Sequence, residues 1–154
     1  MQLREFTPND AEDWARIFHA AVHELAAQHY SPAQRNAWSA EPATYQKVLD
    51  HVKDHQVWVA VDDTDRAQAF IELEDNGHID CFYCHPDVAG QGVGRALYEH
   101  LEAEARKAGI ARLFVEASET AKGFFIRQEF VELERCALTR NSVMLHNYRM
   151  EKRL

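Results

Sequence analysis

Apolar residues recur at helical spacing near the start of the chain. Six of them lie at helical intervals and form one face of a helix: Trp14, Ile17, Phe18, Ala21, Val22 and Leu25. Ahead of this face, Thr7-Pro8-Asn9-Asp10 supplies an N-cap residue, a proline at the first helical position and an acid at the third. The pattern predicts a short edge strand over residues 3–6 and a helix that continues to about His29.

Two shorter helices and three strands are predicted next. Ser31-Pro32-Ala33-Gln34 repeats the capping pattern and starts a helix toward Trp38, and Pro42 opens another toward Val52. Residues 57–61, 67–73 and 78–84 are predicted to be strands. Asp75-Asn76-Gly77 joins the last two of these as a hairpin, because Asn-Gly readily adopts the backbone of a tight turn.

The second half of the chain continues the alternation of helices and strands. It predicts a helix over 92–108 closed by Gly109, a buried parallel strand over 112–116, a helix over 119–128, and a terminal hairpin of strands 130–139 and 143–150. No linker, repeat or low-complexity stretch interrupts this order. With 154 residues, of which 46% are hydrophobic, the chain can build one sizeable core. We therefore expect a single domain over residues 1–154, of the α/β (α+β) class.

Composition and charge exclude some classes of binding partner. No window approaches about 18 continuous apolar residues, and the first residues lack the apolar stretch of a signal peptide. A net charge of −8 argues against a nucleic-acid partner, which would require a basic face. We expect a cytoplasmic protein that binds neither membrane nor nucleic acid, with a charge compatible with a cationic amine substrate.

The most informative segment is a glycine-rich turn between a strand and a helix. Gly90, Gly92 and Gly94 occupy alternate positions after Pro86, so backbone N–H groups can converge on an anion at the positive end of the following helix. A Walker loop is excluded because no Lys-Ser/Thr follows the glycines, and the G-x-G-x-x-G/A dinucleotide pattern does not fit either. The segment predicts a site for a pyrophosphate-bearing cofactor.

Two blocks together resemble the Gcn5-related N-acetyltransferase (GNAT) family. They are residues 85–98 (HPDVAGQGVGRALY) and residues 115–130 (VEASETAKGFFIRQEF). The resemblance implies a mixed central sheet in which the second to fourth strands are antiparallel, the fourth and fifth are parallel, and helices cover both faces. It also implies direct transfer of an acetyl group from acetyl-CoA to a primary amine of a small molecule or peptide, without a metal.

Four positions depart from the family pattern, and one of them is Ser118, which stands where Asn is common. With Pro86 setting the register, Ala89 stands where the family has Arg or Gln; a register starting at Gln91 also satisfies the short motif but places the loop two residues too far from Pro86. Phe125 stands where Tyr is frequent, and Glu129 stands where Gly usually precedes Phe130. The departures at Ala89, Phe125 and Glu129 leave an alternative open, namely a catalytically impaired CoA-binding sensor or structural domain.

The resemblance implies the cofactor and substrate residues. The cofactor set is Phe82, Tyr83, Cys84, Ala89, Gly90, Gln91, Gly92, Val93, Gly94, Arg95, Ala96, Ser118, Phe124 and Phe125. Backbone N–H groups around Phe82 to Cys84 are expected to stabilise the tetrahedral oxyanion. Because the first two helices wall the acceptor pocket in this fold, the substrate set is His23, Glu24, Tyr30 and Trp38.

The general base must be a residue near the acceptor amine. Strand alternation predicts that His78, Asp80, Phe82 and Cys84 share one face, and His78 stands where histone-acetylating members of the family carry a catalytic Glu. Neutral histidine accepts a proton near pH 7. His78 is therefore one candidate base, although it can also be a solvent-exposed residue at the start of a strand without a catalytic role. Asp80 and Glu72 are further candidates for the base, and Glu116 ranks after them.

The proton donor for the departing thiolate cannot be Phe125, because phenylalanine has no hydroxyl. Water can serve, since a thiolate is a fair leaving group. Tyr83, Tyr98 and Tyr148 are the alternative donors, although alternation is expected to turn Tyr83 away from the His78 face.

Metal and haem chemistry are not expected. Cys81-Phe82-Tyr83-Cys84-His85 matches the C-x-x-C-H haem pattern, but two cysteines three apart on a strand point to opposite sides, and Cys136 is the only other cysteine. His19 and His23 lie four apart on the first helix without an H-E-x-x-H motif and are expected at the surface. Whether the chain forms a homodimer is left open.

Overall fold

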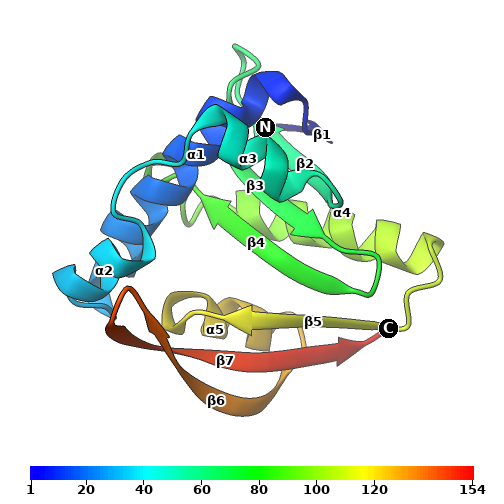
Figure 1. Cartoon of the computed structure of the whole chain (residues 1–154). Coiled ribbons are helices and arrows are strands. Elements are labelled where there is room, and N and C mark those ends of the chain that lie inside the picture. The colour runs from blue at the N-terminus through cyan, green and yellow to red at the C-terminus, as the bar shows by residue number, and fades with distance from the viewer.

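The computed structural model describes residues 1–154 as one mixed seven-stranded sheet (Figure 1). The strand order is β1 (Gln2–Glu5), β2 (Gln56–Val61), β3 (Ala67–Leu73), β4 (His78–Cys84), β5 (Arg112–Ala117), β7 (Val143–Arg153) and β6 (Val131–Arg140). All neighbouring strands are antiparallel except β4 and β5, which are parallel. The expected α/β class and sheet arrangement are confirmed.

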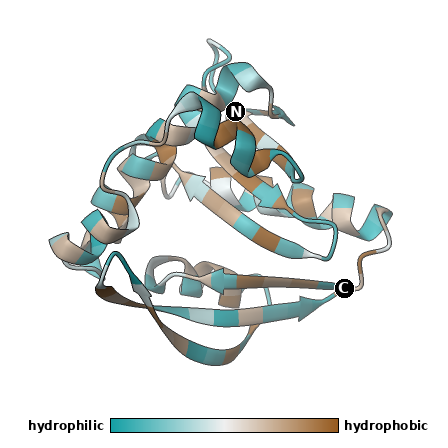
Figure 2. Ribbon diagram, in the orientation of Figure 1, coloured by the Kyte–Doolittle hydropathy of each residue, from teal (hydrophilic) through white to brown (hydrophobic).

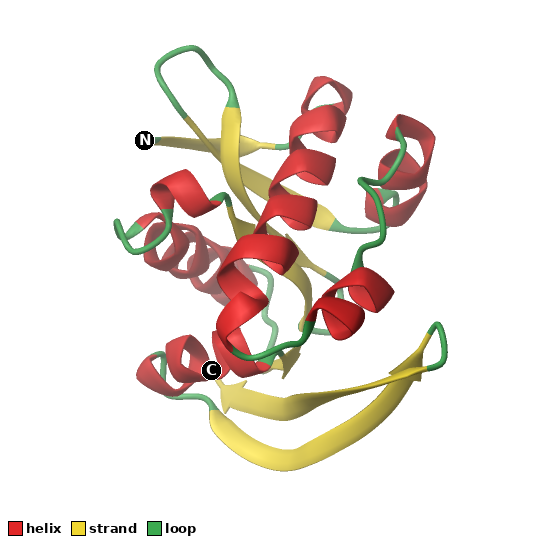
Figure 3. Ribbon diagram, turned by 90° about the vertical axis from the view of Figure 1, so that its left-hand side faces the viewer, coloured by secondary structure: helices red, strands yellow, loops and turns green.

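Helices cover both faces of the sheet (Figure 3). On one face, α1 (Ala11–Ala20) and α3 (Tyr45–Val52) pack on β2 and β3 through a core that includes Trp14, Val48 and Phe70. On the other face, α4 (Val93–Lys107) and α5 (Glu119–Arg127) enclose a larger core, and hydrophobic residues dominate β2 to β4 (Figure 2). The short α2 (Pro32–Trp38) lies near β7. None of these helices combines the length and apolar character needed to span a membrane.

The first helical region is less regular than its apolar spacing predicts. A 3-10 turn at Pro8–Asp10 precedes α1, a π-helical turn follows at Ala21–Leu25, and a 3-10 turn closes the region at Ala26–Gln28. The predicted start of the third helix at Pro42 is wrong. The helix begins at Tyr45, because the Thr44 hydroxyl caps it by accepting a hydrogen bond from the backbone N–H of Lys47.

Strands β4 and β5 pair over only two residues. His78 lies opposite Phe114 and Ile79 opposite Val115, after which the two strands diverge (Figure 1). From Asp80 onward the β5-facing edge of β4 has no strand partner. Backbone N–H groups on that edge are therefore left without a ladder bond and are open to a ligand.

A β-bulge in β4 changes the direction of its side chains. Ile71 of β3 pairs with Phe82 and Leu73 with Ile79, so Glu72 faces both Asp80 and Cys81. As a result Phe82 and Cys84 pack on the α4 side, whereas Cys81 and Tyr83 pack on the α1 side.

The bulge overturns two expectations. Simple alternation predicts that Asp80 shares a face with Phe82 and Cys84. In the structure it lies instead beside His51 of α3. Tyr83 lies on the same side of the sheet as Asp80 and Cys81 and is not turned away from them. The expectation that Cys81 and Cys84 point to opposite sides is confirmed, and all three cysteines are free.

Glu129 adopts a left-handed backbone, with φ of 71°, directly after α5. Side chains rarely adopt this conformation, and glycine does so without a steric penalty. We predict that Glu129→Gly raises the free energy of unfolding by about 0.5–1 kcal/mol in urea denaturation. Gln128→Gly is the control, because Gln128 has φ of −89° and glycine there should be destabilising. Equal losses in both variants would contradict the prediction.

Candidate active site

The turn between β4 and α4 presents a row of free backbone donors. The N–H groups from Gly90 to Arg95 make no hydrogen bond within the protein, and the first bond of α4 runs from Ala96 N–H to the Gly92 carbonyl at 3.1 Å. Gly90 and Gly92 have φ of 76° and 85°, and Gly92 is the N-cap residue. Free donors at the positive end of a 15-residue helix form an anion site that suits a diphosphate.

Gly94 serves a different purpose in the same turn. A Cβ atom at this position would lie 3.3 Å from Cζ of Phe82 and 3.4 Å from Sγ of Cys84. Glycine therefore lets the first turn of α4 approach β4 closely, which holds the free donors beside the unpaired edge of that strand.

A cavity of about 570 Å³ opens beside this turn. Most of the predicted cofactor residues line it, namely Phe82, Tyr83, Cys84, Ala89, Gly90, Gly92, Gly94, Arg95, Ser118 and Phe124. Gln91, Val93 and Ala96 belong to the turn and to α4 but do not line the cavity, and Phe125 lines a different one. Ser118 also caps α5, since its hydroxyl accepts a hydrogen bond from the N–H of Ala121.

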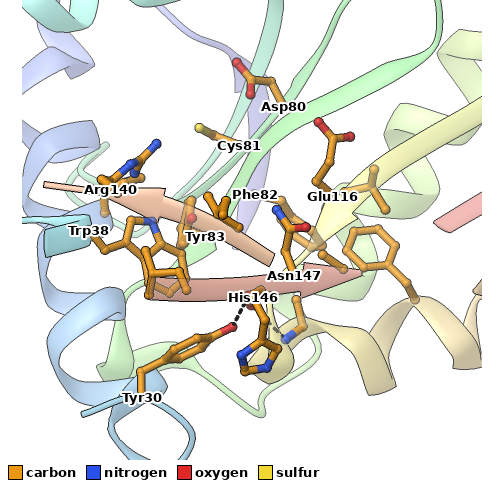
Figure 4. Close-up of a pocket in the computed structure, with 18 of the residues that line it drawn as sticks. Tyr30, Trp38, Asp80, Cys81, Phe82, Tyr83, Glu116, Arg140, His146 and Asn147 are labelled. Carbon is orange, nitrogen blue, oxygen red and sulfur yellow. Dashed lines mark hydrogen bonds between the residues drawn. The ribbon is translucent and has the colours of Figure 1, made fainter. Parts of the chain in front are cut away.

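A second cavity, of about 380 Å³, lies on the α1 side of β4 (Figure 4). Its walls are aromatic, and its polar lining consists of His51, Asp80, Glu116, Ser118, Arg140, His146 and Asn147 together with the hydroxyls of Tyr30 and Tyr83. Of the predicted substrate residues, Tyr30 and Trp38 line it, whereas His23 and Glu24 line neither cavity.

The two cavities meet beside the unpaired edge of β4. Five residues line both: Trp38, Phe82, Tyr83, Ser118 and Ala121. They come from α2, β4, α5 and the turn before α5. We call the cavity beside the glycine turn the cofactor-side cavity and the second one the acceptor-side cavity. A ligand in the first can reach a ligand in the second at this junction.

Glu72 is a buried carboxylate held by three donors. Its side chain has no exposed surface; Oε2 accepts from Nε1 of Trp14, and Oε1 lies 2.8 Å from both His51 Nε2 and His55 Nδ1. Burial raises the pKa of Glu72, but these hydrogen bonds outweigh it and hold the pKa below its ordinary value. The same bonds raise the pKa of both histidines. Glu72 does not line the acceptor-side cavity.

His78 lies outside both cavities, between two carboxylates. Its Nδ1 is 2.9 Å from Glu74 and its Nε2 is 3.0 Å from Glu116, and these bonds raise its pKa to about 9. At neutral pH the imidazole is therefore protonated and holds no free nitrogen to accept a proton. The same bond lowers the pKa of Glu116, whose carboxylate lines the acceptor-side cavity.

Asp80 also lines the acceptor-side cavity. Burial, and then the charge of Glu72, raise its pKa above the ordinary value. Its carboxylate Oδ2 lies 3.4 Å from Nε2 of His51.

Among the tyrosines considered as donors, Tyr83 alone lines the cavities, and it lines both. Burial raises its pKa well above 10, so its hydroxyl stays protonated. Tyr98 instead donates to Glu102 at 2.7 Å, and the ring of Tyr148 lies beneath the Lys122 ammonium.

The Tyr30 hydroxyl links two separate parts of the backbone by hydrogen bonds. It donates to the His146 carbonyl and accepts from the Glu119 N–H, and the ring is buried (Figure 4). His19 and His23 are half-buried and hydrogen-bonded to Ser39, so they are less exposed than the surface position predicted for them. They hold the first helical region against the segment after α2.

Four polar residues of the acceptor-side cavity were missed in the sequence. Three of them, Arg140, His146 and Asn147, come from the terminal hairpin, and His51 comes from α3. Arg140 forms no ion pair, so its charge is available to an acceptor with an anionic group. Only the four-residue spacing of His51 and His55 offered a signal in the sequence.

Comparison with known proteins settles the family. The model of the acetyltransferase (GNAT) domain matches residues 26–152. The chain belongs to the GNAT family. It is an acetyltransferase, and two relatives that are named as N-acetyltransferases agree with this assignment. An uncharacterized N-acetyltransferase of Escherichia coli K12, YafP, is 33% identical over 130 residues, which are 84% of this chain and 81% of the relative.

Another relative and two solved structures extend the comparison. The peptidyl-lysine N-acetyltransferase YjaB of Salmonella typhimurium is 35% identical over 95 residues, 62% of each chain. A GNAT structure from Rhodopseudomonas palustris has a TM-score of 0.92 at 33% identity and covers 99% of this chain and 95% of its own. PaiA N-acetyltransferase from Thermoplasma acidophilum, solved with coenzyme A, shares the fold with a TM-score of 0.78 at 20% identity over 99% and 98% of the two chains.

The hydrogen bond from Trp14 to Glu72 should stabilise this GNAT domain measurably. Trp14→Phe removes a donor to a buried charged group, which costs about 1.5–3 kcal/mol beyond the lost packing. Trp58→Phe is the matched control, because Trp58 is equally buried but donates to no protein group. We expect urea denaturation to show this extra loss for Trp14→Phe, and equal losses would show that the bond contributes nothing net.

Proposed function

We propose that this GNAT enzyme transfers an acetyl group directly from acetyl-CoA to a primary amine of a small molecule or peptide. The observation that carries the proposal is the junction of the two cavities beside the unpaired edge of β4. One cavity holds the free donors for a diphosphate, and the other holds carboxylates that attract a cationic amine.

The cofactor assignment draws on the anion site and on related structures. In this proposal the diphosphate of CoA accepts hydrogen bonds from the Gly90–Arg95 turn, and the pantetheine arm follows β4 to the junction. PaiA was solved with coenzyme A, and YncA of Salmonella typhimurium was solved with acetyl-CoA. YjaB is named for peptide lysine, which supports an amine acceptor.

Glu116 is the general base of the proposed reaction. It is ionised at neutral pH and lines the acceptor-side cavity, whereas His78 is protonated and Glu72 is enclosed. Glu116 takes a proton from the incoming ammonium, directly or through water, because a protonated amine has no lone pair for attack. His78 is a positioning residue that holds the Glu116 carboxylate.

The remaining steps take place at the junction. The amine nitrogen attacks the thioester carbonyl, and unpaired N–H groups of β4 stabilise the oxyanion. The carbon–sulfur bond then breaks and the Tyr83 hydroxyl gives its proton to the departing thiolate. The second proton of the amine nitrogen passes through solvent to Tyr83 and restores its hydroxyl. Tyr83 thus replaces the hydroxyl that Phe125 lacks.

The alternative, a CoA-binding sensor, rests on Ala89, Phe125 and Glu129. Two of these departures are compatible with catalysis in this fold, since Tyr83 reaches the junction and Glu129 adopts the backbone that glycine would have there. A panel of amines and lysine peptides with acetyl-CoA separates the two functions. CoA binding without acetylation of any amine would favour the sensor.

The glycine turn gives a test of cofactor binding. Gly92→Val forces a branched side chain into a φ of 85°, so the donors of the turn should shift and CoA affinity should fall at least about tenfold in calorimetry. Gly109→Val is the control, because Gly109 has φ of 76° at the opposite end of the same helix. Unchanged CoA affinity in Gly92→Val would contradict the site.

Catalytic roles are tested in steady-state kinetics on an accepted amine. Glu116→Gln should lower kcat by roughly 100-fold, and Tyr83→Phe by at least about tenfold, with CoA affinity near wild type. Tyr98→Phe is the control for a buried tyrosine outside the cavities and should change kcat less than about twofold. If Tyr83→Phe behaves like Tyr98→Phe, water protonates the thiolate.

A further inference from the structure

A cluster of metal-ligand side chains lies beside the acceptor-side cavity and takes no part in the proposed acetyl transfer. His51 belongs to α3, His55 lies just beyond its end, Glu72 comes from β3 and Asp80 from β4. One donor atom from each lies within 4.8 Å of the donor atoms of the others. Four donors from three separate chain segments converge on one point.

The spacing of these donors approaches that of a tetrahedral site. Glu72 Oε1 lies 2.8 Å from His51 Nε2 and 2.8 Å from His55 Nδ1, and Asp80 Oδ2 lies 3.4 Å from the first nitrogen and 3.9 Å from the second. Ligands about 2.0–2.2 Å from a zinc ion are separated from one another by about 3.3–3.6 Å. Displacements of a few tenths of an ångström accommodate the ion.

Neighbouring residues contact the four donor side chains and orient them, as residues that hydrogen-bond to metal ligands do in known metal sites. Trp14 donates to Oε2 of Glu72, which leaves Oε1 directed at both histidines. The other ring nitrogen of His55 lies 3.5 Å from Glu74 Oε1, and a carboxylate behind a metal-bound imidazole fixes its orientation. Such contacts prepare a site before an ion arrives.

The carboxylates of the cluster also lack a lysine or arginine partner. Neither Glu72 nor Asp80 pairs with a lysine or arginine, although Glu72 has no exposed surface and Asp80 is half-buried. Two imidazoles and two carboxylates match the donor preference of a first-row divalent ion. A bound divalent ion would neutralise both carboxylates.

We propose that His51, His55, Glu72 and Asp80 bind a divalent transition-metal ion of the zinc class. All four positions of the ion are filled by protein, so the site is structural and holds the end of α3 against β3 and β4. His51 and Asp80 also line the acceptor-side cavity, so the ion fixes one wall of that cavity. A metal is not expected from the sequence, because neither the cysteines nor the His19–His23 pair forms a site there. The four ligands come together only in the fold.

Zinc binding is tested by competition with a chromogenic chelator and by the visible spectrum of the Co²⁺ form. We expect one Zn²⁺ per chain, a rise in thermal stability with Zn²⁺, and tetrahedral Co²⁺ bands. His51→Gln with His55→Asn retains side chains that can donate to Glu72, so the fold should persist while Zn²⁺ affinity falls at least about 100-fold. His19→Gln with His23→Gln is the matched control, since that pair is also four apart but faces Ser39 and no carboxylate.

Three outcomes would overturn the proposal. They are a wild-type chain that fails to compete with the chelator, an affinity unchanged in the His51/His55 variant, and a loss confined to the His19/His23 variant. Circular dichroism and CoA calorimetry check that each variant is folded. If the double variant does not fold, Asp80→Asn removes one anionic ligand from a half-buried position and must itself weaken Zn²⁺ binding.

Discussion

Strands β4 and β5 are paired at only two positions, and their separation beyond Ile79 is the constraint on which the site depends. A fully paired sheet would bury the β4 edge and close the junction between the two cavities. Because the strands diverge, the backbone of β4 remains available to a ligand, and α4 can place its free N-terminal donors close to that edge through Gly94. Cofactor and acceptor can then meet from opposite sides of one strand.

The bulge in β4 lies opposite Glu72, the most unusual residue of the core. Glu72 is a fully buried carboxylate, which is costly unless every oxygen is hydrogen-bonded. Opposite it, the extra residue of the bulge turns both Asp80 and Cys81 toward α3, so His51 and His55 approach Glu72 and Asp80 together. The same local irregularity therefore builds the cavity wall, supports the end of α3 and creates the proposed metal site.

Regular features of the fold follow from local sequence patterns. The glycine turn, the Asn76-Gly77 hairpin and the apolar strands were predictable because their residues act on neighbours in the chain. The bulge was not predictable, since nothing in residues 78–84 breaks the alternation. It arises where β4 meets β3, and it places Asp80 on the side of Cys81 and Tyr83 instead of the side of Phe82 and Cys84. The hairpin residues Arg140 and Asn147 and the ligand His51 reach the site only through long-range packing.

Chemical roles were harder to predict than positions. His78 looked suitable for a base because isolated histidine titrates near neutral pH, but Glu74 and Glu116 raise its pKa to about 9. Glu116, ranked last from the sequence, is the base that we propose, because β5 carries it into the acceptor-side cavity. A crystal structure of the protein with coenzyme A tests the central claim most directly: the diphosphate should lie on the Gly90–Arg95 amides and the sulfur at the junction between Phe82 and Tyr83, whereas a sulfur directed away from that junction would contradict it.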